Sequence, residues 1–409
     1  MTVERPRPAE RATTRPPSAL SGVRVLDFTR YQQGPFSTVL LSDMGAEVIK
    51  VEEPGGEPGR ATGLGRDGFS AYFEAHNRGK KSIVLDLRRA EAREVVRRLV
   101  PAVDVVVENF RPGVMERWRL GYGDLRALRP DIIFASGSAW GRQGPWGERP
   151  GYDHVAQALS GVMSEQGGGP GHPPHALIGG FADQVGAMLL AYGVACAIVA
   201  REHFGVGQHV DVSLIGAMTS LQSMPLVRFL RTGQQPGFQE RRAATYTHYE
   251  CADGRYVAIA ANTQAFWERM CDALERPDLK QDERFAGPFG RAEHKDALVR
   301  ELERHFRTRP ADAWLERLTA ADVPNAPVLD YAGVAEHPQF WANGYLQEID
   351  TPNLGQMRVP GPPVQMSATP PRVQGGGPEL GHHTEEVLLA VGYGWAEIER
   401  LKDAGVFGK

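Results

Sequence analysis

The stretch Asp27-Phe-Thr-Arg-Tyr-Gln-Gln-Gly-Pro35, continued by Met44-Gly-Ala-Glu-Val-Ile-Lys-Val-Glu-Glu-Pro54, decides the fold of this chain. Residues 23–28 form a short apolar run rich in β-branched side chains, which predicts a buried strand. Residues 37–44 have the length and apolar spacing of a short helix, and residues 46–51 predict a second strand. Together these segments predict one βαβ unit.

The loop after the first strand carries Tyr31, Gln32 and Gln33, and Gly34-Pro35 punctuates it. In open α/β sheets, ligands bind in the crevice outside the carboxyl ends of the strands. These polar side chains are therefore candidate site residues. A loop of solvated glutamines explains the same spacing equally well, so both interpretations stay open at this point.

Composition bounds the class of protein. A chain of 409 residues is too long for one compact core, so two or three units are expected. The net charge is -4, and basic and acidic residues are interspersed along the chain. The sequence therefore gives no sign of a basic surface that would bind nucleic acid or an anionic membrane. The three cysteines form no Cys-x-x-Cys motif, which excludes a cysteine-based zinc site and favours a reducing, cytoplasmic location.

Two segments resemble targeting signals only superficially. Arginines in the first 20 residues are typical of organelle import, but the prolines among them prevent the amphipathic helix that such a signal needs. A disordered tail over residues 1–20 is expected instead. The longest apolar run, residues 185–200, is too short for a membrane span and rich in Ala and Gly, which predicts a buried, closely packed helix.

Strand and helix patterns alternate beyond the opening unit, as in an α/β protein with a mostly parallel sheet. The further predicted strands of this region are residues 82–87, 103–108, 132–136 and 208–213. The predicted helices between them are residues 90–99 and 124–128, a long helix that begins at Asp183, and, after the last strand, residues 215–230. Residues 141–180 are dense in Gly and Pro around one predicted helix, 154–163, and long loops of this kind are usually functional or mobile.

The pattern changes in the second half of the chain. A hairpin of residues 246–251 and 256–261, followed by helices, predicts a second, smaller α+β domain. Those helices are residues 266–274, 292–306 and 311–318, and two more are predicted in the tail at 384–390 and 395–402. The predicted organisation is a tail (1–20), a large domain (21–232), a small domain with linkers (233–342) and a return to the large domain (343–409).

Two motifs are rejected. Gly63-Leu-Gly65-Arg-Asp-Gly68 matches the Gly-x-Gly-x-x-Gly pattern of dinucleotide sites, but it follows a Pro/Gly loop instead of a strand. His382-His383-Thr-Glu385 suggests a metal, but adjacent histidines near the start of a surface helix are more often solvated. No metal is expected.

Charged residues are further candidates for the functional site, but the sequence supports them less strongly. Asp183 and Asp153 each precede a predicted helix, where free backbone N–H groups favour an anion, and most aspartates at such positions only cap the helix. Catalysis and capping both stay open for them. Basic residues near the strand ends fit a phosphate-bearing ligand or ordinary surface charge, and they are Lys80, Lys81, Arg88, Arg111 and Arg117.

A set of ordered motifs then points to a family. They are Ser21-Gly-Val-Arg-Val-Leu-Asp-Phe28, Gln32-Gln-Gly-Pro35, Gly45-Ala-Glu-Val-Ile-Lys-Val-Glu52, Lys81-Ser-Ile-Val-Leu-Asp-Leu87, Glu108-Asn-Phe-Arg-Pro-Gly113, Gly205-Val-Gly-Gln208, Asn325-Ala-Pro-Val328 and Leu380-Gly-His-His-Thr-Glu-Glu-Val-Leu388. From about residue 20 to its end, the chain resembles the class III CoA-transferases (CaiB/BaiF family). The resemblance implies a Rossmann-like large domain built from both ends of the chain, a small domain between them, and an interlocked homodimer.

The resemblance also implies which residues form the active site. Asp183 falls on the family's nucleophilic aspartate, Gln32 on the glutamine that holds the reacting acyl group, and Asp153 on a glutamate of the same site. The residues expected to bind CoA are Gln33, Leu85, Arg88, Asn109, Phe110, Arg111, Arg117 and Tyr152. The expected substrates are an acyl-CoA and a free carboxylic acid, with no permanently bound cofactor, no nucleic acid and no membrane as partner.

The implied chemistry passes through an anhydride of Asp183 and an aspartyl-CoA thioester. Both hydrolyse in water, so loops around Gly167 and Gly179 are expected to close the site. Backbone N–H groups at the start of the Asp183 helix, together with Gln32, are expected to stabilise the oxyanions. Two alternatives remain. One is an acyl-CoA racemase, disfavoured because Tyr152 stands where α-methylacyl-CoA racemase has its histidine proton carrier, and the other is a CoA-binding protein without turnover.

The chain departs from the formyl-CoA transferase pattern at two places. Glu53 stands where that enzyme has an arginine that contacts CoA, and the glycine loop of its small domain has no counterpart near Gly237. Gly375-Gly-Gly377 lies in the tail and does not replace that loop. The nucleotide contacts are therefore expected to differ, and formyl-CoA and oxalate are not the expected substrate pair.

Overall fold

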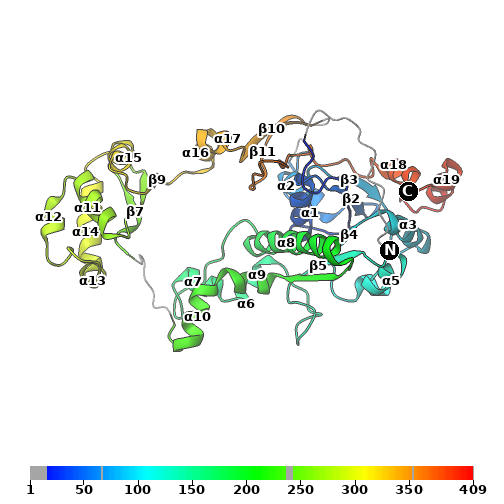
Figure 1. Ribbon diagram of the computed structural model, residues 1–409, viewed down its shortest axis with the longest axis horizontal. Helices are drawn as coiled ribbons and strands as arrows, with labels where there is room; N and C mark the ends of the chain where they lie inside the picture. The colour runs from blue at the N-terminus through cyan, green and yellow to red at the C-terminus, as the bar shows by residue number, and fades with distance from the viewer. Residues whose placement is uncertain (1–15, 66–67, 236–242, 352–353, 409) are drawn as a thin grey trace. The chain divides into compact units, whose positions relative to one another are not determined.

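Six parallel strands form the central sheet of the computed structural model, in the order β3-β2-β1-β4-β5-β6 (Figure 1). The strands are β1 Arg24–Asp27, β2 Glu47–Glu52, β3 Lys81–Val84, β4 Val105–Glu108, β5 Ile133–Ser138 and β6 His209–Ser213. In β1, Leu26 pairs with Ile49 of β2 and with Val106 of β4. The strand order reverses between β1 and β4, as in doubly wound dinucleotide-binding folds. The predicted α/β class with a mostly parallel sheet is confirmed.

The structure describes residues 16–65, 68–235, 243–351 and 354–408. Most of the predicted tail, Arg66 and Asp67 of the rejected glycine pattern, and Gly237 lie outside these ranges. The chain divides into a large unit, residues 1–236 with 341–409, and a small unit, residues 237–340.

Helices cover both faces of the large unit's sheet. On one face α1 (Gln33–Asp43) and α8 (Phe181–Phe204) pack against Val25, Val48 and Val107. On the other face, Leu26, Ile49 and Val106 share a core with α3 (Ala90–Leu99), α18 (Thr384–Ala390) and α19 (Trp395–Asp403). Neighbouring strand residues point to opposite faces, so continuous apolar runs are what a sheet buried on both sides requires.

The first helix begins earlier than predicted. Residues 37–44 were expected, but α1 starts at Gln33, so Gly34 and Pro35 lie in its first turn instead of in the loop. Proline is tolerated there because the first N–H groups of a helix have no intrahelical acceptor. Gly34 is required for a separate reason, since a Cβ at this position would overlap the Thr29 side chain.

Three helices predicted as single segments are each divided in two. They are α6 (Asp153–Leu159) and α7 (Val162–Gly167), α9 (Leu214–Leu221) and α10 (Ser223–Thr232), and α13 (Pro288–Glu293) and α14 (Lys295–Phe306). Gly161, with φ 82°, ends the first helix of the first pair. In the second pair Pro225 has no N–H for a carbonyl of the preceding turn, so a new helix starts around it.

The prediction of a buried, closely packed helix over residues 185–200 holds for one face of α8 only. One stripe of α8 is buried and rich in small residues, which lets it lie close to α1 and the sheet. The opposite stripe is open, and Met188, Tyr192 and Val199 are 50%, 67% and 56% exposed. By length and composition alone α8 also passes as a membrane-crossing helix, a test that core helices of this kind satisfy.

The remaining helices of the large unit are α2 Ala71–Asn77, α4 Val114–Arg117 and α5 Tyr122–Leu128. The segment after residue 343 contains a hairpin of β10 (Leu346–Thr351) and β11 (Gly355–Pro360). Neither α2 nor this hairpin was predicted.

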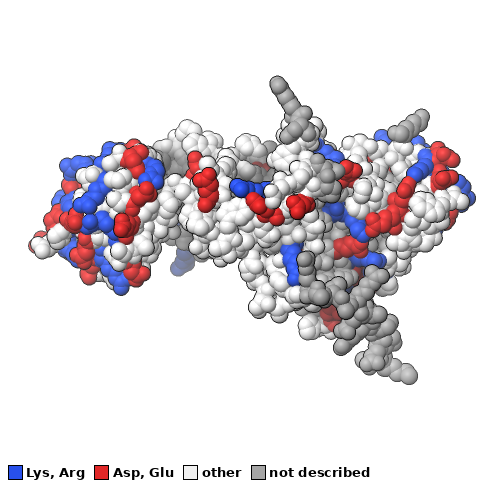
Figure 2. All heavy atoms as spheres, turned by 90° about the horizontal axis from the view of Figure 1, so that it is seen from above, with Lys and Arg blue, Asp and Glu red and all other residues white. Residues whose placement is uncertain are grey.

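The small unit contains the predicted hairpin, β7 (Tyr246–Glu250) and β8 (Tyr256–Ala260), and a third strand, β9 (Asn325–Pro327). Its helices are α11 Gln264–Ala273, α12 Pro277–Gln281, α13, α14, α15 Ala311–Ala320 and α16 Tyr331–Glu336, and α17 Pro338–Ala342 follows. Trp267 and Trp314 fill its core, and the rings of Tyr249 and Phe306 stack 4.8 Å apart. On the face in Figure 2, Lys and Arg alternate with Asp and Glu over this unit.

Candidate active site

A cavity of about 310 Å³ lies at the carboxyl edge of the sheet, beside β1, β4 and β5. Its lining is Arg30, Tyr31, Gln32, Gln33, Asn109, Phe110, Arg111, Gly137, Ser138, Ala139, Pro150, Gly151, Tyr152, Asp183 and Leu214. This is the point where the strand order reverses, which is where open α/β sheets bind ligands. Eight of the residues proposed from the sequence line it: Tyr31, Gln32, Gln33, Asn109, Phe110, Arg111, Tyr152 and Asp183.

Asp183 is the acidic side chain among those lining residues. It is the third residue of α8, which begins at Phe181 with Gly180 as its N-cap, so the helix does not begin at Asp183 and Asp183 is not its cap. Burial, and next the charge of Asp153, raise the pKa of Asp183 to about 7. The carboxyl group therefore titrates near neutral pH.

Asp153 caps the Asp183 helix from outside. Its Oδ1 accepts hydrogen bonds from the backbone N–H groups of Ala182 (2.6 Å) and Asp183 (3.1 Å), and its Oδ2 accepts one from Gln157 (2.7 Å). These N–H groups were expected to be free for an oxyanion. In this geometry that expectation is wrong, because a carboxylate already occupies them.

Gln32 is buried against the same helix end. Its Nε2 donates to the carbonyl oxygens of Gly179 (2.9 Å) and Gly180 (3.3 Å). A Cβ on Gly180 would overlap the Gln32 carboxamide, and φ is +67° at Gly180, so glycine is required there. Residues about 150 positions apart in the chain thus meet at the first turn of α8.

The backbone directly before Gln32 is strained, and a hydrogen bond to a buried glutamate holds it in place. Tyr31 has φ 64°, which is unfavourable for a bulky residue, and its N–H donates to Glu57 Oε2 (2.9 Å). Glu57 is buried, 3.5 Å from Lys50, and it accepts a hydrogen bond from Asn77 (2.9 Å). The Tyr31 ring packs edge-on against Tyr152, with centroids 5.6 Å apart.

The basic residues proposed from the sequence do not form one cluster. Lys80 is fully buried, its Nζ lies 2.9 Å from Asp27, and burial lowers its pKa to about 8. Lys81 pairs with two glutamates. Arg88 is 80% exposed and pairs with Asp86 at 2.7 Å. Arg117 is exposed on α4, so Arg111 alone of these five lines the cavity. Leu85 is buried in the core shared with α3.

The sequence did not indicate Tyr72 and His76, which lie on α2 near the nucleophile candidate. Burial, and next the charge of Asp183, raise the pKa of the Tyr72 phenol. Burial lowers the pKa of His76 to about 4, and its Nδ1 lies 2.7 Å from the Tyr72 carbonyl oxygen. The available signal was Ser70, whose side chain caps α2 by accepting the N–H of Phe73.

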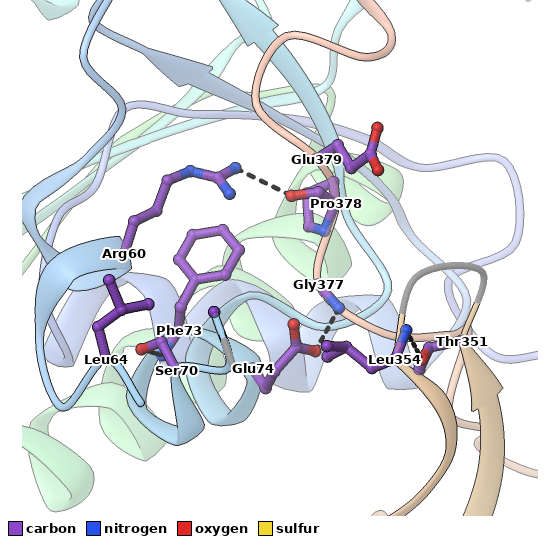
Figure 3. Close-up of a pocket in the computed structure, with 11 residues that line it drawn as sticks. Arg60, Leu64, Ser70, Phe73, Glu74, Thr351, Leu354, Gly377, Pro378 and Glu379 are labelled. Carbon is purple, nitrogen blue, oxygen red and sulfur yellow. Dashed lines mark hydrogen bonds between the residues drawn. The ribbon is translucent and has the colours of Figure 1, made fainter. Parts of the chain in front are cut away.

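A second cavity, of about 290 Å³, lies between α2 and the C-terminal segment (Figure 3). Its polar groups have partners: Arg60 pairs with Glu52 and donates to the Pro378 carbonyl, and Glu74 accepts the N–H of Gly377. The Arg60 guanidinium also lies 3.9 Å from the centre of the Phe73 ring. These contacts stabilise the return of the chain to the large unit.

Comparison with known proteins assigns the family. The model of CoA-transferase family III matches residues 20–384. A succinyl-CoA:mesaconate CoA-transferase of Haloarcula hispanica is 37% identical over 92% of this chain and 97% of its own length, and an acetyl-CoA:oxalate CoA-transferase of Acetobacter aceti is 35% identical over 91% and 95%. The crystal structure of a CaiB/BaiF family protein from Brucella suis superimposes with TM-score 0.81 at 32% identity, covering 92% of this chain and 100% of that chain. The chain therefore belongs to CoA-transferase family III, the CaiB/BaiF family, and is a CoA-transferase.

Proposed function

We propose that this enzyme moves CoA from an acyl-CoA thioester to a free carboxylic acid, with Asp183 as covalent nucleophile. The observation that carries the proposal is the place of the Asp183 carboxyl, which lines the cavity at the strand reversal together with Gln32 and Tyr152. The two CoA-transferase relatives support it, since each is named for an acyl-CoA and a carboxylic acid.

The proposed reaction transfers CoA from one carboxylic acid to another and needs no redox step. An Asp183 oxygen attacks the thioester carbon, the C–S bond breaks, and CoA leaves as thiolate from a mixed anhydride. The thiolate then attacks the aspartyl carbonyl, which releases the donor carboxylate and leaves an aspartyl-CoA thioester. The acceptor carboxylate repeats the two steps in reverse. In each step a negatively charged nucleophile attacks and a negatively charged group leaves, so no proton has to be transferred.

Gln32 is the proposed oxyanion donor, because the helix N–H groups are occupied by Asp153. Its Nε2 donates to the carbonyl oxygens of Gly179 and Gly180. We place the required movement in these two glycines, which have φ +80° and +67°. When the incoming acyl group displaces these two glycines, the Gln32 amide becomes free to donate to the oxyanion. The same segment then excludes water from the site.

Trapping the covalent intermediate tests the proposal. The protein is incubated with succinyl-CoA, treated with hydroxylamine, and analysed by peptide mass spectrometry. We expect a hydroxamate at Asp183, none in Asp183→Asn, and an unchanged yield in the control Asp211→Asn, an exposed aspartate of β6. If neither succinyl-CoA nor acetyl-CoA modifies Asp183 while labelled free acid still exchanges into acyl-CoA, the covalent mechanism is wrong.

The same proposal includes a cytoplasmic homodimer without a permanent cofactor. Its support is the uncovered apolar surface of the large unit: no residue of α10 is buried, and Met224, Val227 and Leu230 are 73%, 65% and 79% exposed. Free cysteines agree with a reducing compartment. Light scattering of the purified protein should give twice the chain mass, and a monomer at micromolar concentration would contradict the dimer.

A further inference from the structure

An ion pair sits beside the wall of the active-site cavity. Arg30 follows β1 and Glu53 follows β2, and their side chains approach to 3.3 Å between Nη1 and Oε1. Both are partly solvated, with 33% and 46% of their side-chain surface exposed. Arg30 lines the cavity, whereas Glu53 approaches the same guanidinium without being part of the lining.

Arg30 is held in place by the loop after β4. Its N–H donates to Asn109 Oδ1 (2.8 Å), and Asn109 Nδ2 donates back to the Arg30 carbonyl (2.9 Å). Its guanidinium lies 5.1 Å from the centre of the Phe110 ring, which packs against Trp118. Arg30 is therefore fixed by backbone and ring contacts that do not require Glu53.

The charge of the cavity makes Arg30 a binding group. Among the lining residues, Arg30 and Arg111 carry the positive charge. A guanidinium binds phosphate oxygens through two parallel hydrogen bonds, and a carboxylate uses the same donors. A phosphate that reaches Arg30 from the cavity therefore competes with Glu53 for one set of N–H groups.

We propose that Arg30 binds a phosphate group of CoA and that Glu53 competes for it, so that Glu53 lowers the affinity of the enzyme for CoA. The inference rests on the proposed function, which supplies CoA as the ligand. An exposed ion pair contributes little free energy, so the phosphate displaces Glu53 and the competition weakens binding only about 2- to 5-fold. Weaker binding of this kind mainly speeds release, which a transferase that exchanges two CoA esters needs in every cycle.

A double-mutant cycle tests the competition. Dissociation constants for CoA are measured by titration calorimetry at low ionic strength, because salt screens exposed charges. Glu53→Gln is expected to bind CoA about 2- to 5-fold more tightly, and Arg30→Gln at least about tenfold more weakly. In the Arg30→Gln background the Glu53→Gln change should have no effect. Arg30→Lys, which keeps the charge without the fork, should lie between wild type and Arg30→Gln.

The control is Glu348→Gln, which removes the same charge from an ion pair with Arg358 in the β10–β11 hairpin and should leave CoA affinity unchanged. Unchanged or weaker binding by Glu53→Gln overturns the inference, as does a gain that persists without Arg30 or equals that of the control. Failure of the proposed function looks different: a wild-type protein that binds no CoA contradicts the function, whereas a transferase whose Glu53→Gln variant binds no more tightly contradicts only the competition.

Discussion

Replacing Asp183, the proposed nucleophile, should make the folded protein more stable. Burial and the charge of Asp153 raise the pKa of Asp183 from 3.8 to about 7. Each pKa unit corresponds to about 1.36 kcal/mol of preference for the neutral form in the folded state. Asparagine has nearly the same shape and carries no charge, so Asp183→Asn avoids this cost while it removes the carboxylate of the proposed nucleophile.

The size of the effect depends on pH in a defined direction. At a pH below 3.8 the carboxyl is protonated in both states and costs nothing. Between 3.8 and about 7 only the unfolded form releases the proton, so wild-type stability falls as the pH rises. Above the folded pKa the loss levels off at about 4 kcal/mol, which corresponds to a shift of about 3 pKa units. The advantage of Asp183→Asn should be about 2 kcal/mol near pH 5 and largest above about pH 8.

Urea unfolding at about pH 5 and about pH 8, at equal protein concentration, measures this difference. The control is Asp211→Asn, which replaces an exposed aspartate of β6 and should show no comparable pH-dependent gain. A destabilised Asp183→Asn, or a gain that is the same at both pH values, would refute the reasoning. The first result would mean that Asp183 has a stabilising partner in the folded state, and the second that its pKa is not raised.

Two further predictions concern the same helix end. Asp153→Asn removes the second cause of the raised pKa, so the midpoint of kcat/KM against pH should move below about 7, by a limited amount because burial is the larger cause. A midpoint that stays or rises would exclude the charge effect. Gly180→Ala should lower kcat at least about tenfold, because the new Cβ overlaps Gln32. Gly205→Ala, with the same φ of +67° and no atom within 4 Å of its Cβ, should keep full activity, and equal losses in both variants would refute a specific contact.

Strand positions were predictable because burial on both faces of a sheet demands continuous apolar runs, such as those of β1 and β4. Helix ends were less predictable. The start of α8 was misplaced at Asp183 because the group that satisfies its first N–H groups, Asp153, lies 30 residues earlier in the chain. Capping rules consider only residues close to the helix end in the chain, so they cannot locate a cap supplied by another helix.

The candidate site was partly predictable for a similar reason. Gln32, Asn109 and Tyr152 follow strands or precede helices at the carboxyl edge, where sequence order implies proximity, and they do line the cavity with Asp183. Arg88 and Leu85 also follow a strand, yet one extends into solvent and the other is buried in the core. Side-chain direction at a strand end depends on packing, which strand position alone does not supply.

By itself the sequence determined the α/β class, the family motifs and the presence of a carboxylate at position 183. Only the tertiary structure decided what that carboxylate is chemically. Its pKa depends on burial and on Asp153, and its neighbour Gln32 is oriented by the carbonyls of Gly179 and Gly180. The physical reason is that electrostatic and hydrogen-bond effects act through distance in space. Folding therefore determines whether Asp183 behaves as an ordinary aspartate or as a group that titrates near neutrality.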